Sequence, residues 1–378
     1  MRILFVSHSF PPPGRPLANV GGMQRVATEL YAALRALPDV QTEGLLLHTS
    51  WRMTHARVPF FQARVLRRLR AEARRPTVDA VLFSSMVTGV TAFRAAPALR
   101  RAGLPTAAIV HGLDVTTPFG PYQRFVPRVF AALDAVLPVS RATGEACVAR
   151  GLDPARLTVV PNGIDTGRLS APSDRLTERR ALARAVGADL PEGALLLASA
   201  GRHVRRKGFA WFAANVMPRL SPDVHWWLAG EGPETEAVRE AARAHGLEAR
   251  VRVLGRVSEA DLARLYRGAD VFAMPNRPVA GDMEGFGVVM LEAGLAGLPT
   301  VGAALEGVLD VIVEGENGHL VPSGDPAAFA DVIMRYARDR AALAALSSRT
   351  SAYVRATFAW EAVARTYVDV LGALTVAA

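Results

Sequence analysis

The 378-residue chain is poor in cysteine and aromatic residues, and it has no long hydrophobic run. Its one cysteine, Cys147, excludes an internal disulfide and a cysteine-based metal site. We interpret Cys147 as a small helix residue, because "TGEACVAR" supplies no partner base for a nucleophile. The longest apolar runs fall short of the ~18 residues of a membrane span, and the run after Met1 is too short for a signal peptide. We therefore expect a cytoplasmic protein, either soluble or peripheral on the inner face of the membrane.

Several chemical motifs are also missing. There is no Asp-x-Asp pair to bridge a metal and a diphosphate, and "DME" at 282–284 is the nearest match. The chain has no P-loop, no G-x-S-x-G elbow and no H-E-x-x-H, and "AGEGPET" (229–235) lacks the third glycine of a dinucleotide fingerprint. We predict no cofactor and no essential metal.

What the chain does contain is basic charge, with 44 Lys and Arg against 35 Asp and Glu, a net charge of +9. This balance favours an anionic partner such as a nucleotide, a phosphorylated sugar, a nucleic acid or an acidic lipid.

Short apolar runs alternate with amphipathic helical patterns along the whole sequence, which predicts parallel sheets covered by helices on both faces. The first series of predicted strands is "RILFVS", "GLLLH", "AVLFSS", "AAIVHG", "AVLPVS" and "LTVVPNG". After an Arg-rich stretch at 172–190 the pattern restarts with "ALLLASAG", "VHWWLAGEG", "VRVLGRV", "DVFAMP", "PTVGA" and "GHLVP". We expect two doubly wound α/β domains, 1–168 and 169–356, with 357–378 packing on either one. Ligands bind at the carboxyl ends of such strands, so the default site is a cleft between two facing sheets.

The second series holds the most informative cluster. "GRHVRRKGF" places Arg202 and Lys207 in a glycine-bounded loop after a strand, where two cations could clamp a diphosphate. "EGFGVVMLE" carries Glu284 and Glu292 around a Gly-x-Gly loop that enters an apolar helix, and a helix start binds anions. The alternative is structural: the charges are solvated, and the two carboxylates cap and edge a buried helix.

Two features of the first series are weaker. His111 follows the apolar strand "AAIV", although a lone histidine is more often structural. Gly21 and Gly22 precede a helix and could cradle a phosphate, or they could serve only a turn.

Taken together, these segments resemble the glycosyltransferase group 1 family, also called family 4, of retaining GT-B enzymes. The resemblance covers nearly the whole chain and includes "GGMQRVATEL", "HGLD", "VVPNGID", "GRHVRRKG", "LAGEGPE", "LGRV", "EGFGVVMLEAGLAGLPTVG" and "FAWEAVARTY". It implies two Rossmann-like domains facing across a cleft, with an N-terminal acceptor domain and a C-terminal donor domain. It further implies metal-independent transfer of a hexosyl group from a UDP- or GDP-linked sugar to a lipid, polyol or saccharide hydroxyl, with retention by a front-face route.

The resemblance also implies roles for individual residues. Arg202 and Lys207 would clamp the diphosphate, Glu284 would hold the donor-sugar hydroxyls and Glu292 the ribose, and His111 would lie beside the donor sugar. The other implied contacts are Gly285, Phe286 and Gly287 with phosphate or sugar, Arg256 and Val257 with the base, Gly21 and Gly22 with phosphate or acceptor, and Asn162 at the hinge. No general base is evident; the leaving phosphate would take the acceptor proton.

Residues 52–75 contain eight arginines and one acid, with hydrophobic residues interspersed. This basic amphipathic pattern fits a helix on an anionic membrane surface, or equally a solvated helix with one buried stripe.

Two rival functions remain. A GT-B-shaped sugar-nucleotide epimerase would use the same donor without an acceptor. A nucleic-acid-binding protein would need aromatic residues interleaved with the basic ones, yet only 7% of residues are aromatic; we expect no nucleic-acid partner.

Overall fold

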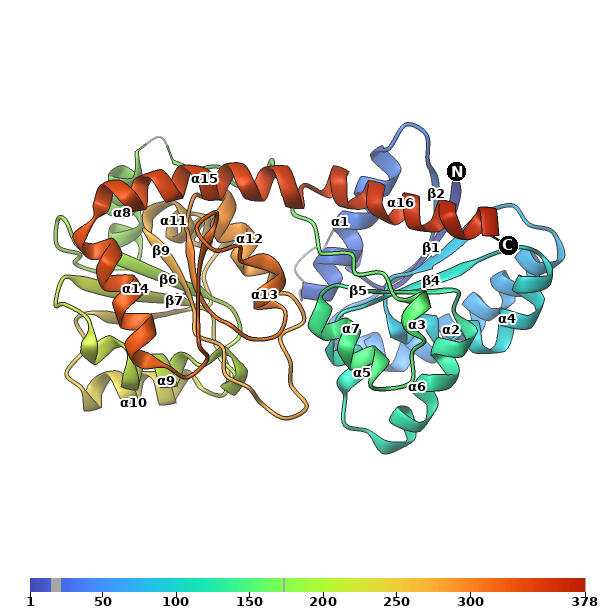
Figure 1. The fold of residues 1–378 in the computed structure, drawn as a ribbon, viewed down its shortest axis with the longest axis horizontal. Coiled ribbons are helices and arrows are strands. Elements are labelled where there is room, and N and C mark those ends of the chain that lie inside the picture. The colour runs from blue at the N-terminus through green and yellow to red at the C-terminus, as the bar shows by residue number, and fades with distance from the viewer. Residues whose placement is uncertain (15–21, 173, 378) are drawn as a thin grey trace. The chain divides into compact units, whose positions relative to one another are not determined.

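The computed structural model describes residues 1–14, 22–172 and 174–377. The chain forms two compact units, one made of Met1–Ile164 with Phe358–Ala378 and the other of Asp165–Thr357. In each unit all paired strands are parallel and helices connect them (Figure 1). The predicted class, two parallel α/β domains, is confirmed. The sequence interpretation had put the boundaries at 168/169 and 356/357.

Unit 1 holds a five-stranded sheet in the order β2-β1-β3-β4-β5. Every residue of β3, β4 and β5 is buried, so helices cover both faces of the sheet there, as continuous apolar strands require. Its elements are β1 Arg2–Phe10, α1 Gly22–Ala36, β2 Gln41–His48, α2 Trp51–Arg74, β3 Ala80–Phe83, α3 Met86–Gly89, α4 Ala92–Arg101, β4 Thr106–Val110, α5 Leu113–Thr116, α6 Gly120–Ala132, β5 Ala135–Pro138 and α7 Arg141–Val148.

The sixth strand predicted at "LTVVPNG" was wrong. Leu157 forms only an isolated bridge with Val136 of β5, followed by a hydrogen bond of 3.0 Å from the Val160 N–H to the Pro138 carbonyl. Pro161 comes next and has no N–H to donate, so the pairing cannot extend into a ladder.

The last helix, α16 Trp360–Ala377, belongs to unit 1 and packs beside α1 (Figure 1). The indole Nε1–H of Trp360 donates to the Glu29 carboxylate at 2.6 Å, and Arg365 pairs with Asp39 at 2.6 Å. A β-carbon on Gly163 would lie 2.4 Å from the Trp360 ring, so the indole packs directly on that backbone. The chain therefore returns to its first unit after completing the second.

Unit 2 holds a six-stranded sheet in the order β11-β10-β9-β6-β7-β8, and all six predicted strands are present. The central strands β6 and β7 are buried along their whole length. Its elements are α8 Arg175–Ala185, β6 Leu195–Ala200, α9 Phe209–Asn215, β7 Val224–Ala229, α10 Thr235–Ala244, β8 Val251–Gly255, α11 Glu259–Gly268, β9 Val271–Met274, α12 Val288–Leu295, β10 Thr300–Ala303, α13 Val308–Val311, β11 Gly318–Val321, α14 Pro326–Arg338 and α15 Arg340–Phe358.

Candidate functional site

Three neighbouring strands of unit 2 deliver their following loops to one edge of the sheet. Strands β6, β9 and β10 lie side by side and parallel, so their carboxyl ends coincide. The loop after β6 carries Arg202 to Lys207, the loop after β9 carries Asn276 to Glu284, and Glu306 follows β10. Residues separated by about a hundred positions in the sequence are thereby brought to one place.

The centre of this cluster is the buried carboxylate of Glu284, whose residue is 7% exposed. Its Oε2 atom accepts from Lys207 Nζ at 2.5 Å, from Asn276 Nδ2 at 3.0 Å and from the Arg206 guanidinium. Arg206 also donates to Asp282 at 3.0 Å. No described residue hydrogen-bonds to the second oxygen, Oε1. The carboxylate is therefore fixed through one oxygen and keeps the other for a further donor.

The charges in this cluster control its ionisation. Burial disfavours the charged form of Glu284, but Lys207 and Arg206 outweigh it and lower the pKa of this carboxyl to about 2. Burial raises the pKa of Glu306, which lies in the same cluster. Glu284 thus stays ionised at any physiological pH.

Close backbone packing holds the two cations in place. Arg205–Lys207 form a 3₁₀ turn that ends at Gly208, with φ +66°. A β-carbon on Gly208 would lie 2.0 Å from the carbonyl oxygen of Pro275, so only glycine allows the loops after β6 and β9 to touch. The Arg277 N–H donates to the Arg206 carbonyl at 2.9 Å and ties the same loops together.

The second glutamate of the motif lies on α12, which begins at Val288, so the stretch from Glu284 to Gly287 is not helical. No side chain in the described part of the chain caps this helix start, so its first N–H groups are not capped by a side-chain acceptor there. Glu292 is buried and accepts from the Tyr266 hydroxyl of α11 at 3.0 Å. Phe286 is also buried.

Three other predicted residues of unit 2 lie at the same edge; Arg202 and Arg256 are exposed, and Val257 is half-buried. Arg202 is exposed, and among the described residues none pairs with its guanidinium. Arg256 and Val257 directly follow β8; the Arg256 side chain is 83% exposed and pairs with Glu231 at 2.7 Å. These positions are accessible to a ligand without rearrangement of the core.

In unit 1, His111 directly follows β4 and its Nε2 lies 2.9 Å from the Ser84 carbonyl oxygen. A carbonyl only accepts, so Nε2 carries a proton in this contact, and no described residue hydrogen-bonds to Nδ1. Burial and the neighbouring His111 lower the pKa of His8, near the end of β1, to about 4. Gly22 is the exposed first residue of α1, whereas Gly21 lies outside the described residues.

Two further residues of unit 1 were singled out in the sequence, Asn162 and Cys147. Asn162 is 4% exposed, and none of the residues that the structure describes hydrogen-bonds its Oδ1. Cys147 lies buried in the hydrophobic core on α7, and burial raises the pKa of its thiol to about 12. A thiol that stays protonated is a packing residue, as the sequence indicated.

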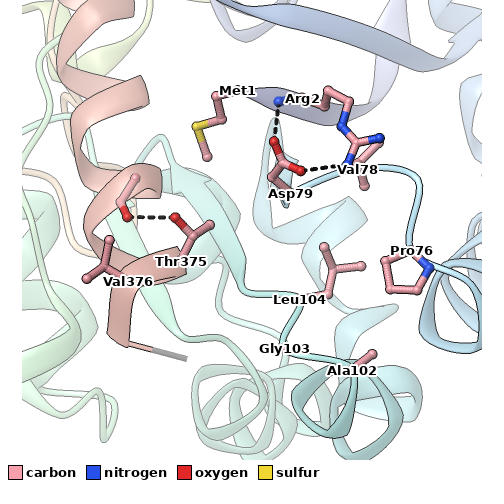
Figure 2. Close-up of a pocket in the computed structure, with 11 residues that line it drawn as sticks. Met1, Arg2, Pro76, Val78, Asp79, Ala102, Gly103, Leu104, Thr375 and Val376 are labelled. Carbon is pink, nitrogen blue, oxygen red and sulfur yellow. Dashed lines mark hydrogen bonds and ion pairs between the residues drawn. The ribbon is translucent and has the colours of Figure 1, made fainter.

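Unit 1 contains a cavity of about 700 Å³, and Figure 2 shows residues that line it. It is lined by residues that precede β1, β3 and β4, such as Asp79 and Leu104, and by the end of α16. Asp79 is engaged there by the backbone and guanidinium of Arg2. This cavity is at the amino edge of the sheet, away from the carboxyl edge that carries His111.

Sequence reasoning missed three members of the Glu284 cluster, namely Arg206, Asn276 and Glu306. Arg206 lies inside the run "RRK", where no spacing distinguishes one cation from the next. Asn276 and Glu306 are among the first polar residues after predicted strands. The rule that drew attention to Arg202 could have found both.

Within the described parts of the chain, no helix is long and apolar enough to cross a bilayer. No group of three or more His, Cys, Asp or Glu residues there is arranged to hold a metal ion.

Two parallel-sheet α/β units are the architecture of GT-B proteins. Residues 194–339 match the family described as glycosyl transferases group 1, and residues 20–168 match glycosyltransferase family 4. The chain belongs to this group of glycosyltransferases.

Among similar sequences, D-inositol 3-phosphate glycosyltransferase of Xylanimonas cellulosilytica is 36% identical over 66% of this chain and 59% of its own length. Phosphatidyl-myo-inositol mannosyltransferase of Mycobacterium leprae is 40% identical over 31% of this chain and 29% of its own. The aligned regions thus span less than two thirds of these relatives.

Similar solved structures cover the whole fold. HepE of Anabaena in complex with UDP has a TM-score of 0.73 at 20% identity, covering 99% of this chain and 100% of its own. The catalytic domain of starch synthase IV of Arabidopsis thaliana, bound to ADP and acarbose, has a TM-score of 0.77 at 14% identity, with 99% of each chain covered.

Proposed function

We propose that this protein is a retaining glycosyltransferase that moves a hexosyl group from a UDP- or GDP-linked sugar to a hydroxyl acceptor. The observation that carries the proposal is the Glu284 carboxylate, which three donors hold through one oxygen while the other has no described partner. A fixed, ionised acceptor of hydrogen bonds is suited to sugar hydroxyls, because it recognises them without further reorganisation. Lys207, beside it, supplies a buried positive charge.

The diphosphate would be held by cations and backbone amides. Arg202 is exposed and without a described partner, so its guanidinium fork is available to a phosphate. The uncapped start of α12 adds N–H groups and the positive end of the helix dipole. Such a set can neutralise the charge of the leaving diphosphate without a metal. We therefore propose that the transfer is metal-independent.

The remaining donor contacts follow the resemblance. Glu292 would hold the ribose, with Tyr266 fixing its carboxylate, and Arg256 with Val257 would line the base. HepE is described in complex with UDP, and a uridine donor is the first to test. The relatives named for inositol substrates favour a polyol or lipid-linked acceptor. His111, in unit 1, would lie beside the donor sugar and offer Nδ1 as a hydrogen-bond acceptor.

The first experiment is a thermal-shift and hydrolysis screen over UDP-, GDP- and ADP-linked sugars. We expect at least one donor to raise the melting temperature and to be hydrolysed slowly. Glu284→Ala and Lys207→Ala should then lose turnover by at least about 100-fold with an unchanged circular dichroism spectrum. The exposed residue Glu236, on α10, provides the control Glu236→Ala. Wild-type rates in both site variants would contradict the assignment.

The same screen distinguishes the rival functions. Isomerisation of the donor without any acceptor would favour an epimerase. Salt-dependent retention of the protein on DNA that a donor does not compete away would favour a nucleic-acid-binding protein.

We further propose that helix α2 brings the enzyme to a membrane surface that holds the acceptor. Its stripe Phe61, Val65 and Leu69 is buried in the core of unit 1, as the solvated-helix alternative required. Its opposite face still exposes Phe60, at 80%, together with arginines 57, 64, 67, 70 and 74. An exposed aromatic residue among cations suits an anionic membrane surface, where the ring enters the interface and the charges meet headgroups.

Liposome co-sedimentation tests this contact with and without anionic lipid. Wild type should bind only the anionic vesicles, and Phe60→Ser with Arg64→Gln and Arg67→Gln should abolish that binding. The control removes two arginines from an exposed helix of unit 2, Arg239→Gln with Arg243→Gln, and should bind like wild type. Equal binding by all three proteins, or none, would refute the membrane contact.

A further inference from the structure

Glu306 occupies a backbone conformation that glutamate rarely adopts. It lies three residues after the end of β10, and its φ is +49°. No other described residue except glycine has a positive φ. A β-carbon crowds the backbone in this left-handed region, so the surroundings must hold the residue there. Such residues cluster at functional sites, and Glu306 lies at the carboxyl edge that carries Glu284.

The contacts of this loop identify what it holds. Glu306 Oε2 accepts from the backbone N–H of Glu284 at 2.5 Å, and the N–H of Gly307 donates to the Glu284 carbonyl at 3.1 Å. A β-carbon on Gly307 would lie 2.3 Å from the Gly285 carbonyl oxygen, so the two backbones are in direct contact. Two consecutive residues thus engage both polar groups of the Glu284 backbone, while Lys207 and Asn276 engage its side chain.

The charges around Glu306 mostly disfavour its ionised form. It is half-buried, and the carboxylates of Glu284 and Asp282 repel it, although Arg206 attracts it. No described cation lies within ion-pair distance of its carboxylate. A strained backbone and two like charges are thus tolerated at a position whose side chain, among the described residues, accepts a hydrogen bond from the Glu284 N–H.

We propose that Glu306 is a positioning residue for the transfer reaction: it fixes the peptide of Glu284 and so directs that carboxylate at the donor sugar. The inference rests on the proposed function and adds to it a residue outside the motif. A displacement of about 1 Å in a reacting geometry can cost on the order of 100-fold in rate, which gives the scale of the effect.

Three variants separate positioning from simple stability. Glu306→Gln keeps a side-chain oxygen for the Glu284 N–H and should retain kcat/KM within about 3-fold. Glu306→Ala loses that acceptor and should lower kcat/KM by about 10- to 100-fold. Glu306→Gly also loses it but relieves the strained φ, so it should melt higher than Glu306→Ala and still show the same loss. Binding of UDP alone, which has no sugar, should change by less than about 3-fold in all three.

A second measurement does not depend on turnover. Hydrogen–deuterium exchange of the peptide around Glu284 should accelerate in Glu306→Ala and Glu306→Gly but not in Glu306→Gln, with Glu236→Ala as the control. Unchanged kcat/KM in the alanine variant, no rescue by glutamine, or losses that follow melting temperature would overturn the inference. If wild type turns over no nucleotide sugar while exchange still depends on Glu306, the proposed function fails and the contact with Glu284 stands.

Discussion

The buried ion cluster at Glu284 makes a quantitative prediction for stability against pH. A carboxyl of ordinary pKa 4.5 that is lowered to about 2 in the folded state stabilises it by about 3 kcal/mol at neutral pH. The pKa is depressed on folding, so this contribution is fully present above pH 4.5 and is lost as the pH falls toward 2. By pH 3 about 2 kcal/mol of it is gone.

Glu284→Gln removes the charge and leaves Lys207 and Arg206 without their carboxylate. At pH 7 the variant should unfold with a free energy about 3 kcal/mol below wild type, and by pH 3 the difference should shrink to about 1 kcal/mol. Urea unfolding followed by tryptophan fluorescence measures both values, since Trp211, Trp226 and Trp227 all lie in unit 2.

The control for this series is Glu236→Gln on α10, where the carboxylate is exposed and pairs only with exposed arginines. It should stay close to wild type at every pH. If wild type and Glu284→Gln show parallel pH profiles, the cluster does not hold the carboxylate in its charged form. The reasoning about the fixed acceptor would then fail.

Three other outcomes are expected. Gly208→Ala, where a β-carbon would lie 2.0 Å from a backbone carbonyl, should lower the melting temperature much more than Gly246→Ala, which has a similar φ and open space; equal losses would show that φ alone matters. Tyr266→Phe removes a donor to the buried Glu292 and should cost about 1–2 kcal/mol of unfolding free energy in urea titrations, whereas no change would mean that this bond is not formed. Arg202→Ala should leave the melting temperature unchanged yet weaken UDP binding by about 10-fold or more in calorimetry, and unaltered affinity would remove Arg202 from the diphosphate site.

The strands were predictable because burial on both faces of a parallel sheet leaves continuous apolar runs, and eleven of the twelve predicted runs form ladder strands. The exception, "LTVVPNG", has the same apolar character but only one edge to pair with and a proline that interrupts pairing. An apolar run indicates that a segment is buried. Whether it also forms a strand depends on the neighbouring backbone with which it can hydrogen-bond, and the local sequence does not show that neighbour.

The site was predictable in part. The motif glutamates and Lys207 could be found from their spacing, and the structure joins Lys207 to Glu284. The choice among the arginines of this loop could not be predicted, because it depends on the local backbone. Arg206 lies in the 3₁₀ turn and pairs with Glu284, whereas Arg202 precedes the turn and is exposed. Glu306 could have been found as the first polar residue after a predicted strand, but its contact with the backbone N–H of Glu284 does not follow from residue type.

The return of α16 to unit 1 has a consequence for biosynthesis. The hydrogen bond between Trp360 and Glu29 joins residues 331 positions apart, with all of unit 2 between them. The ribosome synthesises the strands of unit 1 first, but α16, the last helix of this unit, is made only after unit 2 has been translated. The surface of α1 that α16 covers therefore stays open for most of synthesis, at about 5–20 residues per second, and is a surface that a nascent-chain chaperone could protect.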